Sequence, residues 1–254
     1  MERGVVYGPS GKGLDVHRCD GSTLRPVVLL WHGRGPDERD VLDPLARAVA
    51  ERGVVVFVPD WRSDAPDGGR AHLWESIVFV RDNAGDFGGD AARTVLAGWS
   101  LGGKAAAGVG VGGAGAGAGR WRPSGVVAIA SGFDAPAPST GRVPLDDVAA
   151  TRIDPVPFWL VHGTRDAIVH VEKSRRFADA LRERGWRATL IETETDHAGI
   201  VMTEYDPERG RCTPARVRHA IEAGRRTAEV LADAAFYSSG PCSPEGTERA
   251  LGDR

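Results

Sequence analysis

The sequence predicts an α/β protein built on a doubly wound, mostly parallel β-sheet. The continuous apolar runs at residues 27–31 and 54–58 are rich in β-branched residues, which is typical of central parallel strands covered on both faces. Between them, apolar residues recur at helical spacing over residues 40–52, and Gly53 is placed to end that helix. The same alternation of strand and helix continues along the chain, and it is the signature of this fold class.

The remaining elements complete an eight-stranded type of sheet flanked by helices. A chain of 254 residues is long enough for one such domain with a substantial core. We expect this domain to span residues 1–237. Two short strands, at residues 5–7 and 14–18, precede the first central strand. The later strands are expected at 94–97, 125–130, 157–162 and 187–192, and the later helices at 71–83, after residue 103, at 171–184 and at 214–236.

Three stretches fall outside this alternation. Residues 108–119 consist almost entirely of glycine and alanine, and each glycine inside a helix costs about 0.5–1 kcal/mol relative to alanine. We therefore expect the preceding helix to end near Val111 and a mobile loop to follow. Residues 131–155 are too few for a large cap domain and are expected to form a loop or a minimal lid. The polar tail, 238–254, is expected to be disordered.

The composition argues against several classes of function. With a formal net charge of -3 and no clustered basic stripe, the chain is not expected to bind nucleic acid. Cys19, Cys212 and Cys242 are too few and too scattered for a disulfide framework or a zinc site, and we expect no metal and no cofactor. The N-terminus lacks the apolar segment of a signal peptide, and no apolar run reaches transmembrane length. We therefore expect a cytoplasmic protein with no membrane partner.

A serine occupies the tip of a predicted strand-to-helix turn. The sequence Gly98-Trp99-Ser100-Leu101-Gly102-Gly103 follows an apolar run and precedes a run of alanines. Its G-x-S-x-G pattern is that of a nucleophile elbow, in which a tight turn lifts the serine Oγ out of the sheet. The pattern alone also suits a glycine-rich turn with an incidental serine, because the chain contains 34 glycines. The rest of the chain decides between the two interpretations.

Two further residues complete a catalytic pattern with this serine. A hydrolytic serine needs a base to accept its proton and a third group to orient that base. Asp166 follows the strand at 157–162, and His197 follows the strand at 187–192. Catalytic groups in open α/β sheets gather at the carboxyl ends of strands, and the chain order serine, acid, histidine is that of α/β hydrolases. We therefore interpret Ser100, Asp166 and His197 as a catalytic triad.

Other acids and histidines provide competing assignments. Asp134 follows the strand at 125–130 and is an alternative acid, whereas Asp196 is expected to brace the loop beside His197. His162 ends a strand and is expected to be a buried structural histidine. His32 is expected to hold the turn that positions Arg34. His170 opens a predicted helix and His219 lies inside one, so both are expected at the surface, whereas His17 and His72 precede Ser100 in the chain and have no supporting pattern.

These motifs resemble the α/β-hydrolase superfamily, most closely its small esterases and lipases, including bacterial carboxylesterases related to feruloyl esterases. The resemblance implies Ser100 as nucleophile, His197 as general base and then acid, and Asp166 as the orienting carboxylate. It also implies an oxyanion hole formed by the backbone N–H groups of Gly33, Arg34 and Leu101. The matching segments lie between about Val27 and Ile200: His32-Gly33-Arg34-Gly35, the elbow, residues 161–169, and Asp196-His197-Ala198-Gly199.

Arg34 is the departure from the pattern, because the esterases that the sequence resembles have glycine there. Its side chain is placed at the rim of the site, where it either clamps a substrate carboxylate or points to solvent. Solvent is favoured because arginine side chains are mostly exposed in proteins. The aromatic residues Trp61, Trp99 and Phe133 lie just beyond strand ends or beside the serine. They are candidates to line a substrate pocket, with core packing as the alternative.

The sequence as a whole predicts a serine hydrolase that cleaves a carboxylic ester of a small molecule. One alternative is a biosynthetic acyltransferase or cyclase that uses the same triad. The other is a non-catalytic binding protein, since a fold does not fix a function. A complete triad in the expected order argues against the binding protein.

Overall fold

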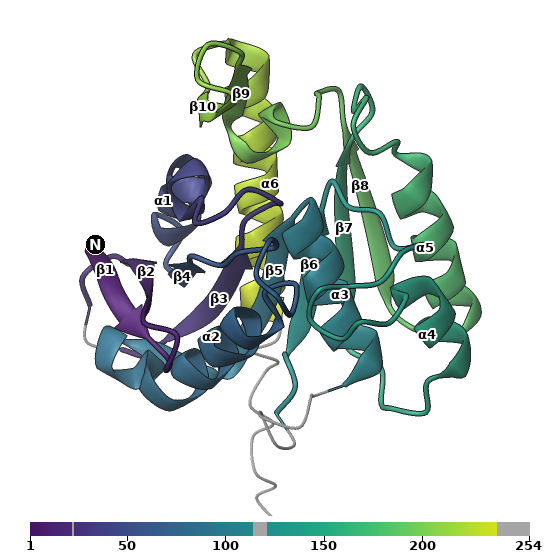
Figure 1. The fold of residues 1–254 in the computed structure, drawn as a ribbon, viewed down its shortest axis with the longest axis horizontal. Coiled ribbons are helices and arrows are strands. Elements are labelled where there is room, and N and C mark those ends of the chain that lie inside the picture. Colours follow the sequence, from purple (N-terminus) through teal and green to yellow (C-terminus); the bar gives the residue numbers. More distant parts are fainter. Residues whose placement is uncertain (22, 114–120, 238–254) are drawn as a thin grey trace, which may run out of the picture.

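Eight strands form one sheet in the order β1-β2-β4-β3-β5-β6-β7-β8 (Figure 1). The computed structural model describes residues 1–21, 23–113 and 121–237. Strands β3 to β8 run parallel, whereas β2 is antiparallel to both β1 and β4. The mostly parallel, eight-stranded sheet that the sequence predicts is therefore confirmed. The strands are β1 (Glu2–Tyr7), β2 (Lys12–His17), β3 (Arg25–Trp31), β4 (Val55–Pro59), β5 (Gly89–Trp99), β6 (Gly125–Ile129), β7 (Phe158–Gly163) and β8 (Ala188–Thr193).

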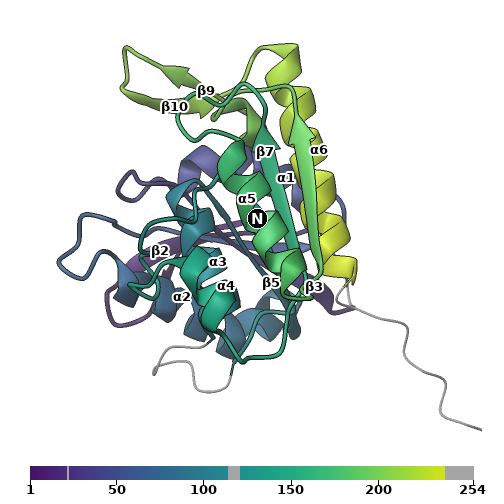
Figure 2. The same ribbon diagram turned by 90° about the vertical axis from the view of Figure 1, so that its right-hand side faces the viewer.

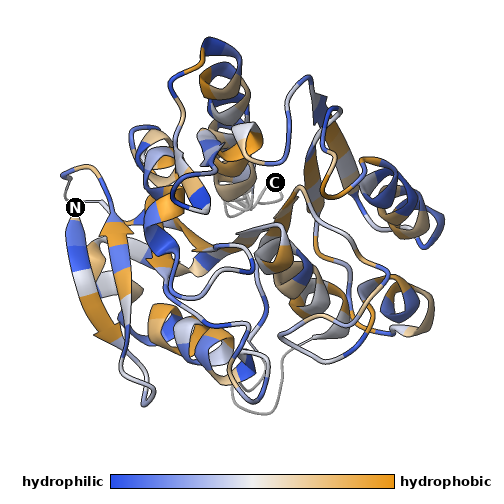
Figure 3. Ribbon diagram, turned by 45° about the horizontal axis from the view of Figure 1, so that its top comes forward, coloured by the Kyte–Doolittle hydropathy of each residue, from blue (hydrophilic) through white to orange (hydrophobic). Residues whose placement is uncertain are grey.

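Helices cover both faces of the sheet (Figure 2). The sheet divides the hydrophobic core into two clusters, one on each face. In strand β3, Val27, Leu29 and Trp31 belong to the first cluster, and Val28 and Leu30 belong to the second. Hydrophobic residues follow the strands, and the surrounding helices alternate between hydrophobic and hydrophilic residues (Figure 3). The first cluster is completed by α2 (Arg70–Asn83), α3 (Leu101–Gly112), α4 (Pro144–Ala150) and α5 (Glu172–Glu183), and the second by α1 (Asp43–Ala50) and α6 (Arg218–Tyr237).

The helix α3 runs to Gly112, close to its expected end near Val111. It tolerates internal glycines because they pack tightly: a Cβ at Gly108 would lie 2.7 Å from the Cβ of Ala137, and one at Gly110 would lie 2.6 Å from Cζ of Phe158. The close approach of α3 to its neighbours offsets the conformational cost of these glycines. The expected loop beyond Gly113 and the expected disordered tail lie outside the described residues.

The predicted helix at 40–52 is instead a 3₁₀ turn, Arg39–Leu42, followed by α1. Pro44 lies in the first turn of α1, and a proline without an N–H group fits the start of a helix but not its interior. The predicted helix at 214–236 begins at Arg218, because an unexpected hairpin precedes it. This hairpin pairs β9 (Thr203–Asp206) with β10 (Arg211–Pro214) and lies beyond the sheet, at the start of α6 (Figure 1).

The segment 131–155 contains α4, which packs against α3 and α5. Of the expected minimal lid, only Gly132 and Asp134 reach the site described below. In the part of the chain that the structure describes, every helix is too short or too polar to span a bilayer.

Candidate active site

Ser100 is the single residue between the end of β5 and the start of α3. Its φ of 55° and ψ of -117° lie in a region that costs a residue with a side chain about 1–3 kcal/mol. The turn is fixed by its surroundings, since the Ser100 N–H donates to the carbonyl of Ile129 at 2.8 Å. A Cβ at Gly98 would lie 2.3 Å from the carbonyl carbon of Gly102, and one at Gly102 would lie 2.3 Å from the carbonyl oxygen of His32. The two motif glycines therefore allow the elbow to close.

Asp166 and His197 are paired by a hydrogen bond. The distance from Asp166 Oδ2 to His197 Nδ1 is 2.7 Å. The other carboxylate oxygen accepts the N–H groups of Ile168 and Val169, each at 2.8 Å. Burial alone would raise the pKa of Asp166, but the hydrogen bonds from His162, His197 and Val169 outweigh it and hold the pKa well below its usual range. Asp166 is therefore an ionised acceptor for His197.

His162 lies behind this pair and supports the carboxylate. Its Nε2 is 2.7 Å from the carbonyl of Val169 and 3.3 Å from Asp166 Oδ2, and its Nδ1 is 2.7 Å from the hydroxyl of Ser174. These partners assign a proton to Nε2, which faces only acceptors. Ser174 and His162 are fully buried, so this serine–histidine pair faces no cleft. The expectation of a buried structural histidine is confirmed.

Ser100 and His197 line the same cleft, of about 760 Å³. Among the contacts of the described residues, no hydrogen bond joins their side chains, and such catalytic hydrogen bonds are often long until substrate binds. The loop that carries His197 is bonded to the elbow, because Trp99 Nε1–H donates to the His197 carbonyl at 2.9 Å. Asp196 braces the loop as expected, since its Oδ1 accepts the Gly199 N–H at 2.7 Å.

The loop after β3 carries the expected oxyanion donors, and buried His32 fixes its shape. The Nδ1 of His32 lies 3.1 Å from the Gly33 carbonyl, while Nε2 accepts the N–H groups of Glu38 and Trp61 at 3.3 and 3.2 Å. Complete burial lowers the pKa of His32 from 6.5 to about 4, so the ring is neutral and can accept these two hydrogen bonds at neutral pH. The expected role of His32 in holding this turn is confirmed.

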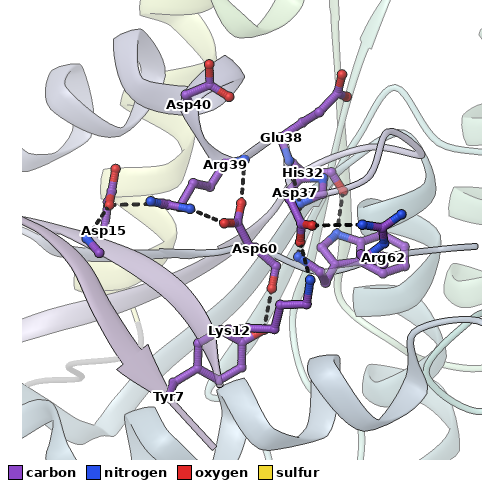
Figure 4. Close-up of polar contacts among 12 residues, drawn as sticks. Tyr7, Lys12, Asp15, His32, Asp37, Glu38, Arg39, Asp40, Asp60 and Arg62 are labelled. Atoms are coloured by element: carbon purple, nitrogen blue, oxygen red, sulfur yellow. Dashed lines mark hydrogen bonds and ion pairs between the residues drawn. The ribbon is translucent and has the colours of Figure 1, made fainter. Parts of the chain in front are cut away.

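Ion pairs anchor the same loop to its neighbours (Figure 4). Asp37 pairs with Lys12 at 2.7 Å and with Arg62 at 3.3 Å. Arg39 contacts Asp60 and also pairs with Asp15 at 3.0 Å. These contacts tie the loop to β2 and to the end of β4, so its backbone is positioned from two sides.

The N–H groups of Gly33, Arg34 and Leu101 have no hydrogen-bond acceptor among the described residues. Gly33 and Arg34 border the large cleft beside Ser100, and Leu101 follows Ser100 at the start of α3. A Cβ at Gly33 would lie 3.6 Å from the Cβ of Ser100, which places the loop directly against Ser100. Unpaired donors from two separate elements therefore flank the serine hydroxyl.

The aromatic candidates divide between the cleft and the core. Trp99 lines the large cleft. Trp61 is fully buried because it packs on His32, with ring centroids 5.6 Å apart, and Phe133 is buried because it stacks on Phe177 at 4.0 Å. Neither borders the two clefts at Ser100, so the prediction that they line a pocket is wrong for these two residues.

Asp134 does not contact His197 and instead forms an ion pair with Lys173. The sequence analysis also missed the hairpin, which contributes Tyr205 and Cys212 to the wall of the large cleft. A turn signal was present, since Asp206-Pro207 and Gly210 separate the short β-prone runs around Tyr205 and Cys212. In the described ranges, no three His, Cys, Asp or Glu residues gather as metal ligands.

The chain is similar in sequence and in fold to known esterases. A family model described as Alpha/beta hydrolase family matches residues 27–238. Over 90 residues the chain is 39% identical to Carboxylesterase NlhH of Mycobacterium tuberculosis (strain CDC 1551 / Oshkosh), a match that covers 32% of this chain and only 28% of that protein.

Two solved structures illustrate the likeness of fold. The butyrate-bound esterase Est2 of the Planctomycetes species Thermogutta terrifontis has a TM-score of 0.70 at 20% identity, with 96% of each chain covered. A truncated carbohydrate esterase from gut microbiota has a TM-score of 0.65 at 13% identity, with 93% of this chain and 95% of that chain covered. At such identities the likeness concerns the fold alone.

Proposed function

Because the chain belongs to the alpha/beta hydrolase family, we propose that it is a serine hydrolase that cleaves a carboxylic ester of a small molecule. The observation that carries the proposal is the Asp166–His197 hydrogen bond of 2.7 Å, with His197 lining the same cleft as the strained elbow residue Ser100. A core serine or a surface histidine would not need this arrangement. The sequence likeness to a carboxylesterase supports an ester as the substrate.

The proposed reaction proceeds through an acyl-enzyme on Ser100. Asp166 accepts a hydrogen bond from Nδ1 of His197, which leaves Nε2 as the nitrogen free to accept the serine proton. The serine Oγ attacks the ester carbonyl, and the protonated His197 then donates to the departing alcohol. Water, activated by the same histidine, releases the acid and restores the serine.

The carbonyl oxygen becomes negatively charged when the serine attacks. The unpaired N–H groups of Gly33, Arg34 and Leu101 are the proposed donors to this oxyanion. Donors fixed in advance stabilise the charge without reorganising, and removing one such donor typically costs about 2.7–4 kcal/mol in activation free energy. The buried contacts of His32 and the ion pairs of Asp37 and Arg39 supply this preorganisation.

Labelling with a fluorophosphonate tests the proposal, because an activated serine attacks the phosphorus of this reagent, displaces fluoride and becomes phosphonylated. The expected result is one adduct by intact mass on the wild type and none on Ser100→Ala. Ser63→Ala is the matched control, since Ser63 lines the same cleft and its hydroxyl donates to the Arg34 carbonyl at 2.7 Å. This control should keep the adduct. A folded wild type that takes no label would refute the proposal.

A further inference from the structure

A second, smaller cleft opens on the other side of Ser100. Its volume is about 240 Å³, and its wall includes Ser100, Leu101, Arg34, Lys104, Lys173 and Asp134. It is below the range of about 300–1,000 Å³ that is usual for drug-sized ligands. Arg34, Ser100 and Ile168 border both clefts, so an ester held at Ser100 can extend into each of them.

The small cleft is rich in positive charge. The chain has only three lysines, and two of them, Lys104 and Lys173, meet there. Lys173 is neutralised by its ion pair with Asp134. Among the described residues, Lys104 and Arg34 have no carboxylate partner. Burial and the neighbouring charges of Arg34 and Lys173 lower the pKa of the Lys104 ammonium group, and the nearby carboxylate of Asp134 offsets this only in part.

The position of His197 assigns the two halves of an ester to the two clefts. The general acid must reach the oxygen of the departing alcohol. His197 lines the large cleft and not the small one, so the alcohol occupies the large cleft and the acyl group enters the small one. The large cleft is lined by two carboxylates and two guanidinium groups, so it has no excess of positive charge to attract an anionic group: Glu38, Asp64, Arg34 and Arg211.

We propose that the acyl group carries a free carboxylate, so that the substrate is a monoester of a short dicarboxylic acid. The carboxylate binds between Lys104 and Arg34 and supplies the negative charge that these two cations lack. This inference rests on the proposed serine hydrolase activity. The ester C–O bond breaks as the bond to Ser100 Oγ forms, the serine proton passes through His197 to the alcohol, and water then releases the dicarboxylate.

The test compares two esters of matched shape and different charge. In para-nitrophenyl hydrogen succinate a carboxylate stands where para-nitrophenyl isocaproate has an isopropyl group of similar shape. After subtraction of uncatalysed hydrolysis, which a neighbouring carboxylate accelerates, we expect kcat/KM to favour the hemisuccinate by about tenfold or more. Added salt should reduce the preference, because Lys104 and Arg34 are reached by solvent.

Variants identify the source of the preference. Lys104→Met should lower the ratio of the two kcat/KM values by about tenfold, whereas Lys104→Arg should retain it. Arg34→Met, in an exposed loop position, provides a second test if Lys104→Met does not fold. Arg226→Met is the control for loss of one positive charge, because Arg226 lies on α6 and pairs with Glu229 at 2.9 Å.

The outcomes separate this inference from the proposed function. A wild type that takes the fluorophosphonate label but shows a ratio near one would overturn the anionic acyl site alone. A preference that survives both Lys104→Met and Arg34→Met would overturn it as well. A wild type that takes no label and cleaves neither ester would overturn the proposed function together with this inference.

Discussion

His32 and Trp61 are joined by a ring stack and by two hydrogen bonds. Their rings lie 5.6 Å apart with planes inclined by 28°. The Trp61 N–H donates to His32 Nε2, and the Trp61 indole N–H donates to the His32 carbonyl, each at 3.2 Å. Both residues are fully buried. The end of β4 therefore holds the loop that presents Gly33 and Arg34 to Ser100.

The neutral, buried His32 should make the protein sensitive to acid. Its pKa falls from 6.5 to about 4 on folding, so the unfolded chain binds a proton first as the pH is lowered. The stabilisation is complete above pH 6.5 and is lost as the pH falls towards about 4, by about 3 kcal/mol. Urea unfolding at several pH values should show a shallower pH dependence for His32→Gln. His219→Gln, at an exposed site on α6, should keep the wild-type dependence.

Trp61→Phe should impair catalysis although Trp61 is buried away from substrate. The change leaves the His32 carbonyl without its indole donor, which costs about 1–3 kcal/mol when a buried acceptor is unsatisfied. We expect a lower Tm and a lower kcat with little change in KM, because the oxyanion loop is loosened. Trp159→Phe is the control, since Trp159 packs against Tyr237 at the end of α6. An unchanged kcat in Trp61→Phe would contradict this role.

Ser100→Ala and His197→Ala should each abolish ester turnover without unfolding the protein. Neither change removes a buried apolar group, since Ser100 and His197 are only partly buried. For Ser100→Ala the alanine methyl fits the space of the hydroxyl. We expect kcat to fall by about four orders of magnitude and Tm to shift by a few degrees at most. Turnover that persists in either folded variant would move the nucleophile or the base elsewhere.

Asp166→Asn and Asp134→Asn distinguish the two acids that the sequence proposes. Asparagine at 166 can donate to His197 Nδ1 and so favours the wrong tautomer of the ring, which should lower kcat by orders of magnitude. Asp134 pairs with Lys173 at the small cleft, so its replacement should leave the histidine tautomer unaffected. Steady-state kinetics on a neutral ester measures kcat for both variants. Near-full activity in Asp166→Asn with loss in Asp134→Asn would reverse our assignment.

Gly102→Ala should destabilise the elbow. The added methyl would lie 2.3 Å from the His32 carbonyl oxygen and 2.5 Å from that of Trp31, and backbone atoms cannot move away as a flexible side chain can. A loss of about 1–3 kcal/mol is expected for such overpacking. Gly85→Ala is the matched control, because no atom lies within 4 Å of a Cβ built there. Equal Tm values for the two variants would show that the elbow has room to relax.

Much of the fold and the catalytic pattern could be predicted from the sequence. Strand and helix leave different apolar periodicities, and residues that follow parallel strands meet at one edge of the sheet. These local rules indicated the eight strands, the elbow at Ser100 and the positions of Asp166 and His197. The roles of His32 and His162 as buried structural residues followed from their positions at strand ends.

The tertiary structure alone decided which side chains surround the serine. Trp61 and Phe133 follow strand ends as catalytic residues do, but packing on His32 and Phe177 removes them from the cleft. The turn signal at residues 206–210 does not show that the hairpin forms a wall of the large cleft, and the small cationic cleft has no local signature. Arg34, Lys104 and Lys173 lie in three segments far apart in the chain. Only the folding of the sheet with its loops and helices brings their charges together beside Ser100. Sequence periodicity reports which face of an element is buried, whereas a pocket depends on which distant loops meet above it.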